Sequence, residues 1–105
     1  MAEYKLDLNR SDISDGEVKA VDVAGTKIAL VALEGKLYAL QGYCTHEQGI
    51  LGDGYIDKKE LICPMHAGAF DIETGKANES TSWVTDISTY ACRVDEMTGE
   101  ITVEM

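Results

Sequence analysis

The feature that most constrains this chain is a pair of short segments that each contain one cysteine and one histidine. The first has the pattern Cys-Thr-His and runs from Cys44 to His46, and the second has the pattern Cys-Pro-Met-His and runs from Cys63 to His66. The chain has only two histidines, and both lie in these segments. Thiolates and neutral imidazoles are strong donors to metal ions, and four of them complete a coordination shell. The two segments therefore predict a metal centre that ties two loops together.

Two kinds of metal centre use two cysteines and two histidines, and the grouping of the ligands distinguishes them. A zinc site with this donor set commonly takes its cysteines from one Cys-x-x-Cys pair and its histidines from a second pair. Here each loop supplies one residue of each kind. That mixed arrangement resembles a Rieske centre, in which one iron takes two cysteines and the other iron takes two histidines. The pattern favours the iron–sulfur cluster and leaves a Cys2His2 zinc-stabilised binding module as the alternative.

Length and charge limit the remaining possibilities. The 105 residues suffice for one compact domain, and the formal net charge is −10. Such acidity disfavours binding to nucleic acid or to an anionic membrane, because both are negatively charged. It suits a positively charged protein partner, although acidity also serves solubility alone. The chain has no apolar run of about 20 residues and no apolar secretion signal near its N-terminus. We therefore expect a cytoplasmic protein, and we expect a monomer.

Short strands separated by turns account for most of the chain, and little of it has a helical period. The Glu-Gly pair at 34–35 predicts a tight hairpin, and residues 42–54 and 77–85 are expected to form loops. This pattern predicts an all-β sandwich or barrel. The expected strands are 18–23, 26–33, 36–40, 55–57, 60–63, 87–94 and 100–104.

The ligand motif resembles the signature of the Rieske-type ferredoxins that serve bacterial aromatic-ring-hydroxylating oxygenases. The Ala-Gly-Ala-Phe-Asp sequence at 67–71 and the Thr-Gly pair at 74–75 extend the resemblance, which covers nearly the whole chain. It implies a single Rieske domain over 1–105. In this fold an antiparallel β-sandwich base carries a small cluster-binding subdomain, here expected over 42–70.

The same resemblance implies a cofactor, its ligands and the protein's partners. One [2Fe–2S] cluster would be held by Cys44, His46, Cys63 and His66, with the two histidines near solvent. The chain would not be an enzyme. It would carry one electron at a time from a flavin-dependent NAD(P)H reductase to a terminal ring-hydroxylating oxygenase. A carrier for another type of oxygenase is an alternative, and so is a Rieske-like small subunit of nitrite reductase, although those subunits commonly lack the four ligands.

Departures from related Rieske proteins bear on the expected reduction potential. Rieske proteins of respiratory complexes carry an additional cysteine in each ligand loop, and these two form a disulfide. The matching positions here are Gly49 and Met65. Those proteins also have a serine and a tyrosine whose hydroxyls donate to sulfur atoms, where this chain has Gly68 and Phe70. Because such donors stabilise the reduced state, their absence predicts a potential near the bottom of the Rieske range, about −150 mV.

Trp83 and Cys92 lie outside the ligand motif. Trp83 is the only tryptophan, in a segment where family members often have proline. It is expected either to shield the cluster and contribute to docking or to anchor the last hairpin in the core, since aromatic residues are enriched in cores and at interfaces. Cys92 lies in an expected strand and has no histidine nearby in sequence. It is expected to be a small buried apolar residue and not a ligand.

The charged residues around the first ligand loop are all acidic. Between Lys36 and Lys58 the chain has no lysine or arginine, whereas Glu47, Asp53 and Asp57 all lie in that interval. We therefore expect a negative face around this loop, to which a basic patch on a partner would be attracted. The alternative is that these acids are ordinary solvated loop residues.

Overall fold

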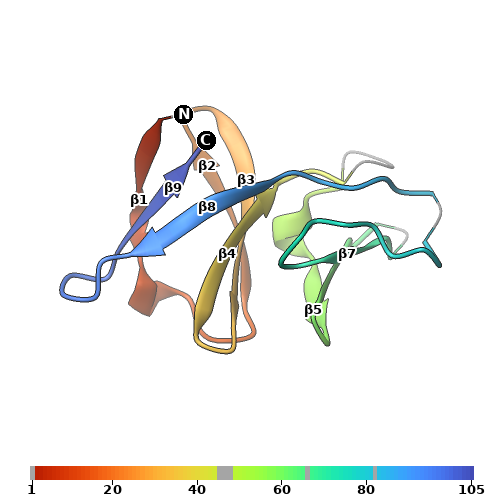
Figure 1. The fold of residues 1–105 in the computed structure, drawn as a ribbon, viewed down its shortest axis with the longest axis horizontal. Coiled ribbons are helices and arrows are strands. Elements are labelled where there is room, and N and C mark those ends of the chain that lie inside the picture. The colour runs from red at the N-terminus through yellow and green to blue at the C-terminus, as the bar shows by residue number, and fades with distance from the viewer. Residues whose placement is uncertain (1, 45–48, 66, 82) are drawn as a thin grey trace.

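The computed structural model describes residues 2–44, 49–65, 67–81 and 83–105. Within these residues the regular secondary structure is antiparallel β-sheet apart from two short 3-10 helices (Figure 1). The elements are β1 (Glu3–Asn9), η1 (Arg10–Asp12), β2 (Val18–Val23), β3 (Thr26–Leu33), β4 (Lys36–Gln41), η2 (Leu51–Asp53), β5 (Tyr55–Asp57), β6 (Glu60–Ile62), β7 (Ala69–Asp71), β8 (Thr89–Val94) and β9 (Glu100–Glu104). No helix among the described residues is long and apolar enough to cross a membrane.

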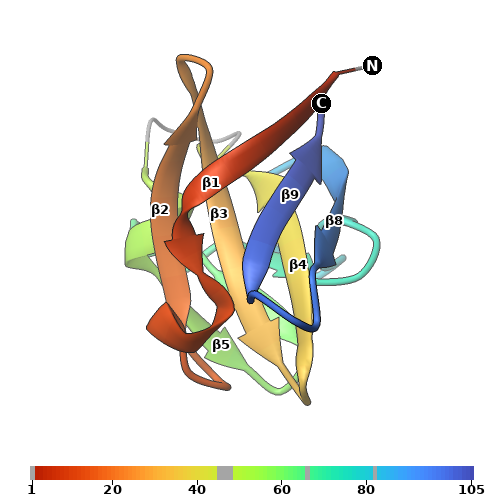
Figure 2. The ribbon, with the colours of Figure 1, turned by 90° about the vertical axis from the view of Figure 1, so that its left-hand side faces the viewer.

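The larger of two sheets has six strands in the order β1-β9-β8-β4-β3-β2. It curls so that β1 crosses in front of β2 and β3 while β9 lies in front of β3 and β4, which gives a sandwich-like, nearly closed barrel (Figure 2). The tight β3–β4 turn confirms the predicted hairpin. Glu34 and Gly35 both have positive φ, at 52° and 81°. Positive φ at both central residues is what a type I′ hairpin turn requires.

Strand β3 is buried on both faces, and this explains why its sequence is a continuous apolar run. Ile28, Leu30 and Ala32 point into the core inside the curled sheet. Ala29 and Val31 point the other way and belong to a second core. Alternating residues of a strand face opposite sides, so a strand with apolar neighbours on both sides loses the usual alternation with polar residues.

The second core supports the part of the molecule that contains the cysteine–histidine segments. The smaller sheet has the strand order β5-β6-β7 and lies beside the curled sheet (Figure 1). Its buried Leu61 and Phe70 pack with Leu40 of β4 and with Cys44 and Cys63. The smaller sheet spans residues 55–71 and so overlaps the subdomain predicted over 42–70. The bounds of that subdomain stay a prediction.

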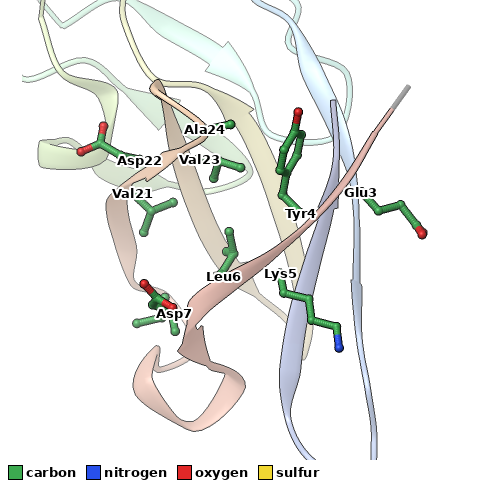
Figure 3. A pocket seen from close by; sticks show the side chains of 10 residues that line it. Glu3, Tyr4, Lys5, Leu6, Asp7, Val21, Asp22, Val23 and Ala24 are labelled. Carbon is green, nitrogen blue, oxygen red and sulfur yellow. The ribbon is translucent and has the colours of Figure 1, made fainter.

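A groove of about 590 Å³ opens between β1 and β2, the two edge strands of the curled sheet (Figure 3). Tyr4, Leu6, Val21 and Val23 line it, so it is the seam at which the barrel fails to close. None of the lining residues is a cysteine or histidine. The groove therefore offers none of the donors expected of the predicted metal centre.

The strand boundaries agree closely with those expected, with a few differences. Strand β4 continues to Gln41, β6 ends at Ile62, and β8 begins only at Thr89. The expected loop over 42–54 contains η2, whose Leu51 and Gly52 are buried against β2. Strands β1 and β7 were not predicted.

Candidate metal centre

The first ligand loop leaves the end of β4 and is closed at its base by backbone contacts. Tyr43 and Ile50 form an isolated antiparallel bridge. Between them, the Cys44 N–H donates to the carbonyl of Gly49 over 2.8 Å. Cys44 thus begins a six-residue loop that Gly49 ends. Its side chain lies in the second core, where the residue is only 8% exposed.

The second ligand loop has the same closure. Cys63 follows β6, and its N–H donates to the carbonyl of Gly68 over 2.8 Å. The Ile62–Ala69 pair of the β6–β7 ladder forms the base. This loop also has six residues, with cysteine first and glycine last. Two loops of matching closure therefore hold the two cysteines at equivalent positions.

The two loops meet at Gly49. A β-carbon at this position would lie 2.9 Å from Cys63 Sγ and 2.7 Å from Met65 Cγ. Real β-carbons essentially never approach other atoms this closely, so glycine is what allows the first loop to contact the second. Gly49 and Met65, identified from sequence as matching the disulfide positions of other Rieske proteins, do face each other, and neither supplies a sulfur for a bridge.

Two of the four predicted ligands are therefore on adjoining loops. His46 and His66 lie outside the described residues, as does Glu47. Cys44 and Cys63 are both buried thiols at the start of their loops. This arrangement fits a group bound between the loops, because cysteine sulfurs at the starts of two adjoining loops are suitable donors to one metal centre.

The second loop is covered by residues from the segment after β7. A β-carbon on Gly68 would lie 2.7 Å from Val84 Cγ1 and 3.7 Å from Trp83 Nε1. Val84 is buried, whereas Trp83 is 43% exposed. Of the two roles expected for Trp83, the structure favours the one at the surface. The side chain lies against the second ligand loop and does not anchor the last hairpin in the core. Phe70 is fully buried beneath this region.

The described residues of the 77–85 segment are irregular, as expected, and hydrogen bonds attach them to the smaller sheet. The Asn78 N–H donates to the carbonyl of Ala69 over 2.8 Å, and its side-chain amide donates to Glu60 Oε2 over 2.8 Å. The buried Thr81 hydroxyl donates to the Asn78 carbonyl, and the Thr81 carbonyl accepts from the Val84 N–H. Sequence reasoning passed over Asn78 and Thr81, which fix the backbone that leads to Trp83.

The Thr-Gly pair of the signature also serves this attachment. Gly75 has φ 77°, a conformation that favours glycine, and a β-carbon there would overlap the carbonyl oxygen of Ile87. The Gly75 carbonyl in turn accepts from the Ile87 N–H over 2.8 Å. The turn thus fixes the start of the segment to its end.

Cys92 packs against an apolar core as expected, although it is half-buried and not fully buried. It lies on β8 opposite Val103 and packs half-buried against the core of the curled sheet. Burial raises the pKa of its thiol to about 11. The thiol therefore stays protonated at neutral pH, which makes it a poor metal ligand and a weak nucleophile.

Comparison with known proteins agrees with the site. Residues 3–91 match the Rieske [2Fe-2S] domain, and the chain belongs to this family. The ferredoxin component of the naphthalene 1,2-dioxygenase/salicylate 5-hydroxylase systems of a Ralstonia species is 42% identical over 82% of both chains. The ferredoxin of carbazole 1,9a-dioxygenase from Nocardioides aromaticivorans IC177 superposes with a TM-score of 0.83 at 27% identity, over 95% of this chain and 96% of that one.

A further solved structure holds a relative together with its partner. It is a complex of reduced oxygenase and oxidised ferredoxin in carbazole 1,9a-dioxygenase. Its matching chain is 28% identical, with a TM-score of 0.83, over 96% of this chain and 91% of that one. The predicted fold, the [2Fe–2S] cofactor and the role as an electron carrier are confirmed, and the chain is not itself an enzyme. The family leaves the zinc alternative without support.

Proposed function

We propose that Cys44 and Cys63 bind one iron of the cluster, that His46 and His66 bind the other, and that the protein passes single electrons from a flavin-dependent NAD(P)H reductase to a terminal ring-hydroxylating oxygenase. The observation that carries the ligand assignment is the matched closure of the two loops. Each begins at a cysteine whose N–H donates over 2.8 Å to the glycine carbonyl that ends the loop.

The chain's own residues contribute burial and rigidity. When bound, a [2Fe–2S] cluster takes up and releases one electron. Cys44 and Cys63 lie in an apolar core with Leu61 and Phe70, which keeps water from the cysteine side. Each loop is closed at its base by a backbone hydrogen bond, and the second follows directly from the β6–β7 ladder, so the two cysteines can stay nearly in place between oxidation states. We place the exit for the electron on the histidine side.

The partners are inferred from what the relatives' names state. The Ralstonia relative is a ferredoxin component of dioxygenase and hydroxylase systems, and a carbazole dioxygenase ferredoxin has been solved bound to its oxygenase. A reductase is required by the same scheme, because the carrier must be reduced again after each transfer. We place the protein in the cytoplasm, where NAD(P)H is available, and as a monomer. A carrier for another class of oxygenase is the second candidate.

The ligand assignment is tested by loading and spectroscopy. Purified protein is expected to contain about two irons and two acid-labile sulfides per chain, with the electron paramagnetic resonance of a mixed-ligand cluster after reduction. Replacing His46 or His66 with alanine should abolish that signal. Cys92→Ala is the matched control and should leave it unchanged. One zinc per chain without visible absorbance would contradict the assignment.

The partner assignment needs a reconstituted system. The purified ferredoxin is combined with the reductase and the oxygenase component of a naphthalene 1,2-dioxygenase system, with NADH and naphthalene. We expect product only when all three proteins are present. Reduction of the ferredoxin without any product would indicate a carrier for a different oxygenase.

A further inference from the structure

Large apolar side chains are exposed mainly around the ligand loops. In the described part of the chain, the exposed large apolar residues are Tyr43, Tyr55, Met65, Trp83 and Met97. The first four come from the ligand loops, the smaller sheet and the segment that covers it. Only Met97 lies elsewhere, in the turn between β8 and β9 at the opposite end of the molecule (Figure 1). Exposed apolar side chains that are concentrated in one half of a molecule make that half a candidate interaction surface.

Trp83 lies in a segment that is attached to the second ligand loop and to its own neighbours. Its Nε1 lies against Gly68, which ends the second ligand loop, and the next residue, Val84, is buried beneath the same glycine. The Val84 N–H donates to the Thr81 carbonyl, and Thr81 is tied to Asn78. An indole held in this way loses little conformational entropy on binding, and 43% of the residue is still available for contact.

Charge around this surface identifies the chemistry of its partner. Between Lys36 and Arg93 the only basic residues are Lys58, Lys59 and Lys76, whereas acidic residues are spread through the whole interval. Residues 77–88, which include Trp83, carry Glu79 and Asp86 and no basic residue. An exposed aromatic side chain in a strongly acidic stretch of the chain is complementary to an apolar pocket with a basic rim.

We propose that Trp83 is the anchor by which this ferredoxin docks on its oxygenase, by inserting its indole into an apolar pocket that has a basic rim. This rests on the proposed function. Trp83 touches the loop of Cys63 through Gly68, so its insertion brings the ligand loops against the oxygenase. Tryptophan is enriched among the few residues that supply most of the binding energy at interfaces. Trp83 is a docking residue here and takes no part in holding the cluster.

The proposal is tested by the affinity of the loaded ferredoxin for the oxygenase component of a naphthalene 1,2-dioxygenase system, measured by isothermal titration calorimetry. Trp83→Ala is expected to raise Kd at least tenfold, and Trp83→Phe is expected to raise it less. Met97→Ala is the matched control, because it removes another exposed apolar side chain from the opposite end, and its Kd should equal that of the wild type. The visible spectrum and the midpoint potential should stay unchanged in all three variants. A Kd for Trp83→Ala within twofold of the wild-type value would overturn the proposal.

A second measurement needs no substitution at position 83. Since the chain has one tryptophan, 5-fluorotryptophan labelling gives a single fluorine resonance that reports on this site alone. Saturating oxygenase should shift and broaden the resonance, and an unchanged resonance in the bound state would overturn the anchor role. If the wild-type ferredoxin shows no binding at all, the proposed oxygenase function itself is contradicted. Binding of the wild type without any contribution from Trp83 contradicts only the anchor.

Discussion

Gly49 and Cys63 lie in contact across the two ligand loops, so closely that a β-carbon on Gly49 would stand 2.9 Å from Cys63 Sγ. Gly49→Ala must therefore displace either the thiol or the loop. Overpacking of this kind costs about 1–3 kcal/mol of folding stability. We expect a lower melting temperature and incomplete cluster loading, measured as iron per chain and as visible absorbance.

A variant of Met65 is the control for Gly49→Ala. The new β-carbon would also lie only 2.7 Å from Met65 Cγ, so the clash with Met65 must be separated from the clash with Cys63. Met65→Ala alone should load normally, since the residue is exposed and its side chain is flexible. The double variant Gly49→Ala/Met65→Ala should remain poorly loaded if the conflict with Cys63 dominates. Full recovery in the double variant would show that Met65, and not the ligand thiol, limits the space.

The reduction potential should be low, near −150 mV, because Gly68 and Phe70 supply no hydroxyl donor to sulfur. Adding a hydroxyl requires room that the structure does not offer, since a β-carbon on Gly68 would lie 2.7 Å from Val84 Cγ1. We therefore expect Gly68→Ser to fold poorly alone and Gly68→Ser/Val84→Ala to load. The double variant should have a higher midpoint than Val84→Ala in protein-film voltammetry. A wild-type midpoint above about +100 mV would refute the argument.

The thiol of Cys92 should be inert at neutral pH. Burial raises its pKa to about 11 from a value of 9.0. Native protein at pH 8 should thus resist alkylation of Cys92 by iodoacetamide, as measured by peptide mass spectrometry, and react once unfolded. Rapid modification of Cys92 in the native state would contradict the burial.

The same shift of the Cys92 pKa makes stability depend on pH, with a definite sign. Between about pH 9 and pH 11 the unfolded thiol is ionised while the folded thiol keeps its proton. The folded state therefore binds more protons, and the free energy of unfolding falls as pH rises through this window. Cys92→Ala lacks this contribution. The melting temperature of the wild type should fall more steeply than that of the variant from pH 9 to pH 11.

The sequence predicted strands whose signals are local. The bounds of β2, β3, β5 and β9 match those expected, and the Glu34-Gly35 hairpin follows from turn chemistry alone. Strand β1 was missed although Tyr4, Leu6 and Leu8 alternate with polar residues, which is a strand pattern. Its pairing with β9 joins the two ends of the chain and could not be read from local sequence.

In the candidate site, too, some features could be predicted from the sequence and others could not. The spacing of cysteine and histidine predicted which loops hold the metal centre, because the residue type alone shows which side chains can bind a metal. The contact between Gly49 and Cys63, and the cover that Trp83 and Val84 form over Gly68, depend on tertiary packing. Those contacts became visible only once β6, β7 and the covering segment were placed against each other.

The negative charge near the first ligand loop should steer the oxygenase to the docking surface. Asp53 is exposed at the end of η2, close in sequence to that loop, while Glu47 lies outside the described residues. Asp53→Asn and Glu47→Gln should each slow association with the oxygenase, and rising ionic strength should slow it too, as the screening length falls toward about 8 Å. Stopped-flow electron transfer at limiting oxygenase measures this rate.

A matched control separates steering from net charge. Glu96→Gln removes the same charge from the exposed turn between β8 and β9, at the far end from the ligand loops (Figure 1). Because steering depends on where a charge lies, this variant should associate at nearly the wild-type rate. The saturating rate of electron transfer should be equal in all variants, since none of them is a proposed ligand. If Glu96→Gln slows association as much as Asp53→Asn does, net charge and not a local negative face governs the encounter. Rates indifferent to both salt and substitution would mean that docking depends chiefly on apolar contact, which would leave Trp83 and Met65 as its determinants.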